Sequence, residues 1–123
     1  SDWSSDVCSS DLLGAEEPGL QVRTRAGEWI PVNPQPGSMV VNVGDMLQRL
    51  SNGVLKSTSH RVVNPAGERS KRSRYSMPFF LHFNPDFLIE AIASCCGPGR
   101  PTPAVPMLAD DYLQERLREI RLK

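Results

Sequence analysis

The sequence has little cysteine, with 3 cysteines among 123 residues. They are Cys8, Cys95 and Cys96, an odd number without the Cys-x-x-Cys spacing of a zinc site. Small disulfide-stapled domains carry an even and denser set of cysteines. The sequence therefore indicates neither a disulfide framework nor a zinc site, and we expect reduced thiols.

The sequence also has no net charge, because 14 basic residues balance 14 acidic ones. Such a chain has no overall field to attract nucleic acid or an anionic membrane. The basic run at residues 68–74 lacks the interleaved aromatic residues that stack on bases, so we expect it to be a solvated loop. A small-molecule ligand is the better expectation, with no nucleic acid partner.

Long apolar runs are missing too, since none approaches the roughly 20 residues that span a bilayer. The first residues lack the basic region and apolar core of a signal peptide. We therefore expect no membrane partner and a cytoplasmic location. The 39% hydrophobic and 23% charged residues are typical of a packed globular protein, and 123 residues suit one domain.

Residues 1–12 differ from everything that follows, with serine and aspartate at eight of twelve positions and little periodicity. Residues 2–12 resemble one reading frame of a common sequencing-library adapter. We therefore treat residues 1–12 as a non-native segment and exclude them from the fold prediction, the alternative being a natural linker. The native domain is then expected over residues 13–123.

The remaining chain reads as short strands separated by turns, followed by a helix. Alternating apolar and polar residues predict strands at 20–24, 28–32, 39–43, 55–63 and 74–83. A short connector helix is expected at residues 46–50. A C-terminal helix is expected from Asp110-Asp111 onward, with an apolar stripe of Leu113, Leu117 and Ile120. This pattern predicts a mainly β sandwich or barrel with the last helix packed outside it.

The predicted strand at residues 55–63 carries polar residues on both faces. Alternation places Lys56, Thr58, His60 and Val62 on one of them. A face rich in polar side chains meets water or a ligand rather than an apolar core. His60 is therefore a candidate metal ligand, although a lone histidine on a strand is more often structural.

The next predicted strand places Arg74 and Ser76 two residues apart on one face. The arginine offers two parallel N–H donors to a carboxylate, and the serine hydroxyl adds a third hydrogen bond. An isolated Arg-x-Ser is more often part of the surface. Tyr75, Met77 and Phe79 point the opposite way, and we expect them to be packing residues.

Two segments together resemble the C-terminal signature of the isopenicillin N synthase-like 2-oxoglutarate/iron(II) oxygenases. The first is Lys56-Ser57-Thr58-Ser59-His60-Arg61-Val62-Val63, and the second, fourteen residues after His60, is Arg74-Tyr75-Ser76-Met77-Pro78-Phe79-Phe80. Further matches occur in the same order at Gly19-Leu20-Gln21-Val22, Trp29-Ile30-Pro31-Val32, Val41-Asn42-Val43-Gly44-Asp45 and Leu50-Ser51-Asn52-Gly53. The resemblance covers nearly all of residues 13–123.

The resemblance implies the C-terminal part of a double-stranded β-helix, or jelly roll, with a short connector helix and a C-terminal helix. It implies that His60 is the distal of two histidine ligands to Fe(II). It also implies that Arg74 and Ser76 hold the far carboxylate of 2-oxoglutarate, whose decarboxylation with dioxygen drives oxidation of a small organic substrate. Some relatives bind a substrate carboxylate at this Arg-x-Ser motif.

One departure from the family pattern concerns the His-x-Asp pair that supplies the other iron ligands. By family spacing, Trp3 and Ser5 stand near those positions, and neither side chain is a usual iron ligand. We therefore expect a truncated domain that is inactive as given. Sheet edges and apolar surface left uncovered by the truncation predict self-association.

A competing hypothesis is a non-catalytic β-sandwich interaction module, in which His60 and Arg74 are structural. Convergence of His60, Arg74 and Ser76 on one concave surface would favour the oxygenase.

Overall fold

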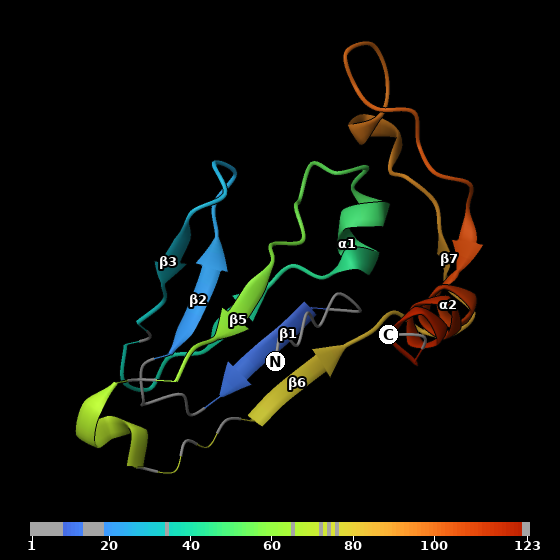
Figure 1. The fold of residues 1–123 in the computed structure, drawn as a ribbon. Coiled ribbons are helices and arrows are strands. Elements are labelled where there is room, and N and C mark those ends of the chain that lie inside the picture. The colour runs from blue at the N-terminus through green and yellow to red at the C-terminus, as the bar shows by residue number, and fades with distance from the viewer. Residues whose placement is uncertain are drawn as a thin grey trace.

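The computed structural model describes residues 9–13, 19–33, 35–64, 66–71, 73, 75 and 77–121, with only the backbone described for 9–13. The described chain contains strands, two α-helices and two 3-10 helices (Figure 1). The strands are β1 (Ser9–Leu13), β2 (Leu20–Arg23), β3 (Trp29–Pro31), β4 (Val40–Asn42), β5 (His60–Val62), β6 (Met77–Leu81), β7 (Leu88–Ile89) and β8 (Met107–Leu108). The helices are α1 (Asp45–Leu50), η1 (Gly67–Lys71), η2 (Ala93–Cys95) and α2 (Ala109–Arg121).

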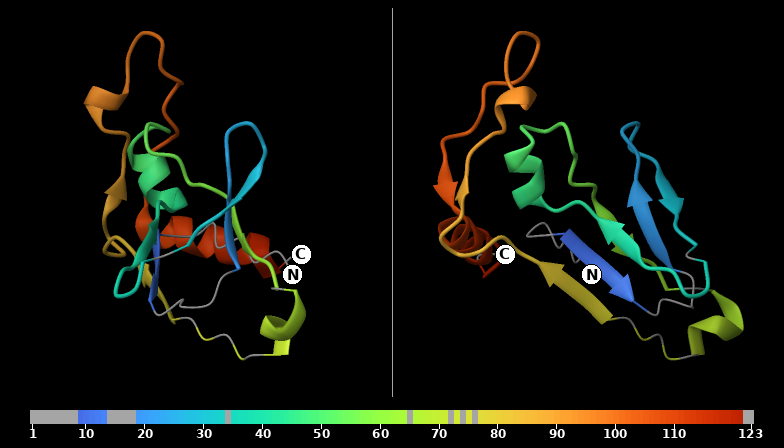
Figure 2. Two further views of the ribbon diagram at one scale, coloured as in Figure 1. Left: turned by 90° about the vertical axis from the view of Figure 1, so that its left-hand side faces the viewer. Right: turned by 180° about the vertical axis from the view of Figure 1, so that it is seen from behind.

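Two antiparallel three-stranded sheets form the body of the molecule. One has the strand order β4-β1-β6, and the other has the order β3-β2-β5. After the β2–β3 hairpin the chain returns to the first sheet for β4, crosses to the second for β5, and returns for β6. This alternation between two antiparallel sheets is typical of a jelly roll, and it confirms the predicted fold class. Figure 2 shows α2 and the β2–β3 hairpin at opposite ends of the molecule.

The strand β1 lies at the centre of the first sheet, although most of it belongs to the segment that the sequence analysis left out of the fold. Its backbone pairs with both neighbours, so that residue 11 lies between Val41 and Phe79. Backbone N–H and C=O groups form these ladders whatever side chains they carry. The strand was thus missed because composition was used to exclude it, and the adapter-like origin of residues 1–12 stays a prediction.

The predicted hairpin of β2 and β3 is confirmed, and its turn is well defined. The Thr24 hydroxyl accepts a hydrogen bond from the Glu28 N–H at 3.1 Å, and the Gly27 N–H donates to the Thr24 carbonyl at 3.0 Å. Gly27 has a φ of 89°, a region that residues with a Cβ rarely adopt. The glycine therefore allows the chain to reverse between the two strands.

Two predicted strands are shorter than expected. The run at 55–63 is paired only over β5, because side chains near α1 accept the N–H groups that a neighbouring strand would otherwise bind. Ser51 Oγ accepts from the Leu55 N–H at 3.0 Å, and Gln48 Oε1 accepts from the Ser57 N–H at 2.8 Å. The run at 74–83 is a strand only over β6, and the preceding loop contains the unpredicted helix η1.

The best-packed core lies between α1, β7 and α2. It consists of Met46, Ile89, Ala109 and Tyr112, each no more than 4% exposed. α2 enters this core through its first turn. Leu113 packs against the core, but Leu117 and Ile120 of the predicted apolar stripe are 37% and 50% exposed, so that part of the prediction was wrong. Among the described residues, none buries the second half of α2.

A polar cluster joins α1 to α2 beside this core. The Tyr112 ring lies between the guanidinium groups of Arg49 and Arg116, each 5.3 Å from the ring centroid. Arg116 also pairs with the buried Asp45 carboxylate at 3.5 Å and donates to the Tyr112 hydroxyl oxygen at 3.2 Å. Burial raises the pKa of Tyr112, while Arg116 partly opposes that rise.

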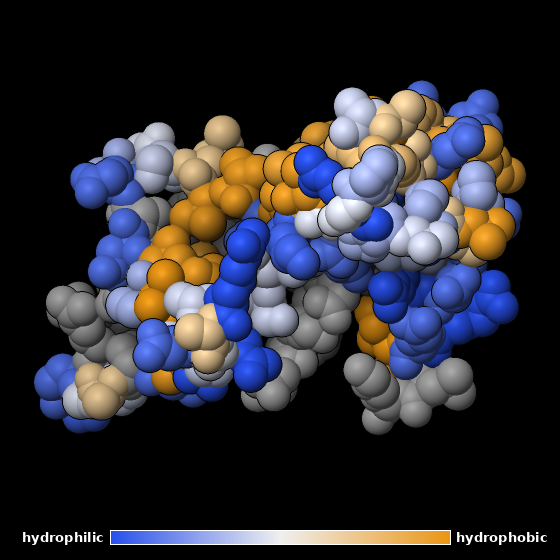
Figure 3. Space-filling model, turned by 90° about the horizontal axis from the view of Figure 1, so that it is seen from above, coloured by the Kyte–Doolittle hydropathy of each residue, from blue (hydrophilic) through white to orange (hydrophobic). Residues whose placement is uncertain are grey.

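The apolar surface of the first sheet is exposed. Tyr75, Met77 and Phe79, which we expected to be packing residues, are 81%, 66% and 57% exposed, so that expectation was wrong. Among the described residues no element covers their side of the sheet. Figure 3, a view from above, shows apolar side chains exposed among hydrophilic ones on that side of the molecule. No helix within the described ranges is long and apolar enough to cross a membrane.

Candidate functional site

His60 is the first residue of β5, which is an edge strand of the second sheet. Its ring is half-buried, and its Nδ1 lies 3.3 Å from the carbonyl oxygen of Thr58. In the tautomer that carries the proton on Nδ1, the Nδ1–H group donates a hydrogen bond to this carbonyl oxygen. Nε2 then has the lone pair with which an imidazole binds a metal ion. Such a hydrogen bond also fixes the orientation of a ligating imidazole.

The strand register places His60 on the same face of its sheet as the buried Leu20. His60 pairs with Val22, and Val62 pairs with Leu20. Directly paired residues share a face, and residues two apart on one strand do so as well. Leu20 is only 2% exposed and His60 is half-buried, whereas Val62 is 49% exposed, so this face is covered at Leu20 and partly covered at His60. The sequence-based placement of His60 on a strand is confirmed, and its role as a ligand stays a prediction.

The opposite face of the same sheet carries a contact that sequence reasoning missed. Arg61 Nε donates to Gln21 Oε1 at 2.9 Å, and its guanidinium lies over the Trp29 ring at 4.2 Å. The residue next to His60 is thus tied to β2 and β3 on the side away from the imidazole. The alternation of Gln21 and Arg61 with apolar neighbours is the signal that could have indicated this cluster.

The segment that leads to His60 is held by α1. Gln48 binds the Ser57 backbone, and Ser51, which is 4% exposed, binds Leu55 through its hydroxyl. Through these contacts, α1 and the residue that follows it position the segment that precedes His60. Sequence reasoning assigned no role to Gln48 or Ser51, and a sequence pattern alone carries little signal for such long-range side-chain to backbone bonds.

Arg74 and Ser76, the predicted carboxylate clamp, lie outside the described residues. β6, which follows them, is antiparallel to β1 in the first sheet, whereas His60 belongs to the second. The convergence of Arg74 and Ser76 with His60 therefore stays a prediction from the sequence.

The described side chains do not by themselves make a complete iron site. Within the ranges that the structure covers, no group of three histidine, cysteine, aspartate or glutamate residues is placed to hold a metal ion. His60 offers one imidazole, and the facial arrangement of non-haem Fe(II) needs two histidines and a carboxylate. His82, the other histidine of the sequence, is exposed just beyond the end of β6. The residues present thus fit one position of the metal site rather than the whole of it.

Six strands that alternate between two antiparallel sheets, with a half-buried histidine on one of them, define a protein of the double-stranded β-helix class. The chain belongs to the 2OG-Fe(II) oxygenase superfamily, whose family model matches residues 2–83. This match confirms the family predicted from His60, Arg74 and the surrounding motifs, and it disfavours the interaction-module hypothesis. Members of this family use Fe(II), 2-oxoglutarate and dioxygen.

Similar proteins come from fungi, bacteria and plants. The 2-oxoglutarate-Fe(II) type oxidoreductase hxnY of Emericella nidulans is 39% identical over 108 residues, which are 87% of this chain and 30% of that protein. A 2OG-Fe(II) oxygenase family protein from Caulobacter crescentus has a TM-score of 0.89 and 51% identity over 95% of this chain and 39% of its own. A Neurospora crassa protein in complex with alpha-KG and thymine has a TM-score of 0.79 and 31% identity, over 95% and 36% of the two chains. The chain thus spans about a third of the length of the relatives it matches.

Proposed function

We propose that the chain is the C-terminal part of an oxidoreductase that couples decarboxylation of 2-oxoglutarate and activation of dioxygen at Fe(II) to oxidation of a small organic molecule. The observation that carries the proposal is the half-buried His60 on β5 of a jelly roll, in a chain of this family. One relative is named a homoarginine-6-hydroxylase, and another was solved with thymine, so small polar molecules are the substrate class we propose. Cytoplasmic localisation stays a prediction from sequence.

In this proposal His60 is one ligand to Fe(II), which when bound supplies the site for dioxygen chemistry. Arg74 and Ser76 bind the far carboxylate of 2-oxoglutarate through a guanidinium fork and a hydroxyl. The Thr58 carbonyl orients the imidazole, and α1 positions the segment that leads to it. In the proposal these residues bind the metal and the co-substrate and orient the imidazole. By family spacing, the two remaining ligand positions fall near Trp3 and Ser5.

We also propose that the 123-residue chain by itself does not sustain turnover, because Trp3 and Ser5 offer no usual iron ligand. The experiment is to introduce the ligands with the double substitution Trp3→His and Ser5→Asp. The substituted chain is expected to bind Co(II), used as an air-stable probe for Fe(II). In a separate assay with Fe(II) and dioxygen, it is expected to release succinate from 2-oxoglutarate. The matched control adds His60→Ala to the double variant, and it should lose the metal.

Three outcomes separate the parts of this proposal. Turnover by the unsubstituted chain would show that the missing-ligand claim is wrong while the oxygenase assignment holds. Metal binding that survives His60→Ala would remove His60 from the site. Binding of 2-oxoglutarate that is unchanged by Arg74→Gln and Ser76→Ala, in variants with unchanged circular dichroism, would contradict the proposed clamp.

Self-association is the partner interaction that we propose for the isolated chain. Met77, Phe79 and Leu81 alternate along β6 and share one face, and they are 57% to 66% exposed. Val41 of β4, 66% exposed, lies in the same cross-strand row as Phe79. Contiguous apolar surface of this kind is typical of an interaction site. The substitution Phe79→Lys should lower the mass measured by light scattering, whereas a wild-type chain that stays monomeric at high concentration would contradict the proposal.

A further inference from the structure

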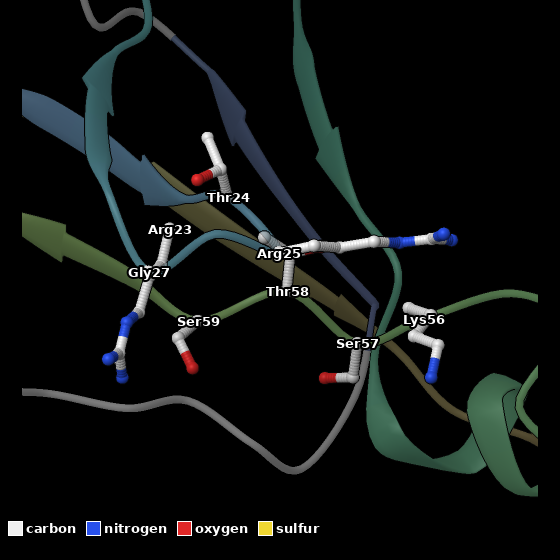
Figure 4. Close-up of a pocket in the computed structure, with 8 residues that line it drawn as sticks. All are labelled: Arg23, Thr24, Arg25, Gly27, Lys56, Ser57, Thr58 and Ser59. Atoms are coloured by element: carbon white, nitrogen blue, oxygen red, sulfur yellow. The ribbon is translucent and has the colours of Figure 1, made fainter.

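A basic groove lies at the turn of the β2–β3 hairpin, beside the segment that precedes β5. It has a volume of about 430 Å³. Its walls come from two stretches of the chain that are distant in sequence, and they are lined by Arg23, Thr24, Arg25, Gly27, Lys56, Ser57, Thr58 and Ser59 (Figure 4). The groove contains none of the three residues assigned to iron or 2-oxoglutarate.

The charge of the groove differs from that of the chain as a whole. Arg23, Arg25 and Lys56 are cationic and exposed, and no carboxylate of a described residue lines the groove, although the net charge of the whole chain is zero. Among the described residues, the cations that form ion pairs with carboxylates are Lys71 and Arg116, both elsewhere in the structure. Three cations with no acidic partner among the described residues repel one another, and an anionic ligand would relieve that repulsion.

The walls of the groove are held by hydrogen bonds that do not involve the cationic groups. The Arg23 N–H donates to the Ser59 carbonyl at 2.9 Å, and this bond ties the hairpin to the segment before β5. On the other wall, Gln48 of α1 holds the Ser57 backbone at 2.8 Å. The groove is therefore preformed, which lowers the entropic cost of binding.

The Arg23 guanidinium lies beside Gly27. A Cβ at this position would lie 3.6 Å from Nη2 of Arg23, which is an ordinary van der Waals contact. Figure 4 shows the Arg23 and Ser59 side chains extending to one side of the groove, and those of Arg25 and Lys56 extending to the other. Each side thus presents at least one cation, and Ser59 adds a hydroxyl next to Arg23.

We propose that this groove binds a small organic polyanion that carries at least two carboxylate or phosphate groups, one for each side. Its volume is in the range of small-molecule sites, about 300 to 1,000 Å³. The described residues that line the groove include no aromatic side chain on which a base could stack, so a nucleic acid is disfavoured. The hydroxyls of residues 57–59 supply further donors for anionic oxygens.

The test uses metal-free protein, so that a probe cannot bind through a metal ion. Citrate and inorganic pyrophosphate, titrated in separate calorimetry experiments, distinguish a carboxylate preference from a phosphate preference. Binding should weaken as sodium chloride is raised, because exposed charges are screened. Amide chemical shifts should change at residues 23–27 and 56–59.

Three single variants, Arg23→Gln, Arg25→Gln and Lys56→Gln, should each weaken binding of the preferred probe by about three- to tenfold. All three positions are exposed, so the fold should be retained. The matched control is Arg100→Gln, which removes the same charge from an exposed position outside the groove and should leave the affinity unchanged. Arg74→Gln should also leave it unchanged, because 2-oxoglutarate, itself a dicarboxylate, is proposed to bind at that residue.

Equal weakening by Arg100→Gln and the groove variants would overturn the proposal in favour of non-specific attraction. Loss of binding in Arg74→Gln alone would overturn it by placing the probe at the proposed co-substrate clamp. Failure to bind either probe would overturn it as well, and would leave the oxygenase assignment untouched.

Discussion

The contact between the two α-helices depends on Tyr112, and its contribution can be measured. The ring is 4% exposed and lies between two guanidinium groups, and its hydroxyl oxygen accepts a hydrogen bond from Arg116. The substitution Tyr112→Leu keeps an apolar side chain in the core and removes both the ring and the hydroxyl. Tyr112→Phe removes the hydroxyl alone.

The expected magnitudes follow from the contacts. Each cation–π contact contributes about 0.5 to 1 kcal/mol, and there are two of them. A hydrogen bond with this partner contributes about 1 kcal/mol. Tyr112→Phe should therefore lower the free energy of unfolding by about 1 kcal/mol, and Tyr112→Leu by about 2 to 3 kcal/mol.

Urea unfolding followed by circular dichroism at dilute protein concentration measures these differences. The matched control is Tyr75→Leu, because Tyr75 is 81% exposed and its replacement should change the free energy of unfolding very little. If Tyr112→Leu and Tyr112→Phe lowered stability equally, the ring between the two arginines would contribute nothing beyond its burial. That outcome would refute the reasoning.

Three further predictions concern the pH dependence of stability, the segment at residues 95–101 and the turn of the β2–β3 hairpin. Burial raises the pKa of Tyr112 above its ordinary value of 10.0. The contribution of the neutral Tyr112 side chain to stability is therefore present below pH 10.0 and is lost as pH rises through the folded-state pKa. The free energy of unfolding, measured against pH, should fall in that range in the wild type and fall less in Tyr112→Phe. Asn52, with a φ of 48°, donates from Nδ2 to the carbonyl oxygens of Cys95 and Pro101, so Asn52→Gly, which tolerates that φ, should speed thiol labelling of Cys95 and Cys96, whereas Asn64→Gly should not. Gly27→Ala should lower the free energy of unfolding in urea by about 1 kcal/mol because of the positive φ at this position; an unchanged stability would show that the turn adapts without strain.

Much of the fold was predictable because it depends on local patterns. Alternation in residues 20–24, 28–32 and 39–43 predicted β2, β3 and β4, and the structure confirms all three. The acidic pair Asp110-Asp111 marked the start of α2 to within a residue, since carboxylates favour the positive end of a helix. Family membership followed from the ordered motifs around His60.

The errors arose where the outcome depends on residues far away in the sequence. Distant side chains bind backbone N–H groups of a predicted strand in one case, and a predicted buried face has no covering element in the other. Leu55 and Ser57 alternate as a strand would, but Ser51 and Gln48 bind their N–H groups, and strand pairing begins only at His60. Met77 and Phe79 have the pattern of a buried face, but nothing among the described residues covers them.

The amino-acid sequence alone determined the family, the order of the main elements and the type of side chain available for chemistry, because these depend on residue identity and short-range periodicity. Only the tertiary structure showed that His60 shares a face with the buried Leu20, that β1 is a central strand, and that three cations from two distant stretches line one groove. The physical reason is that each of these features is created by pairing between segments far apart in the chain, and one sequence read in order carries no record of which segments will meet.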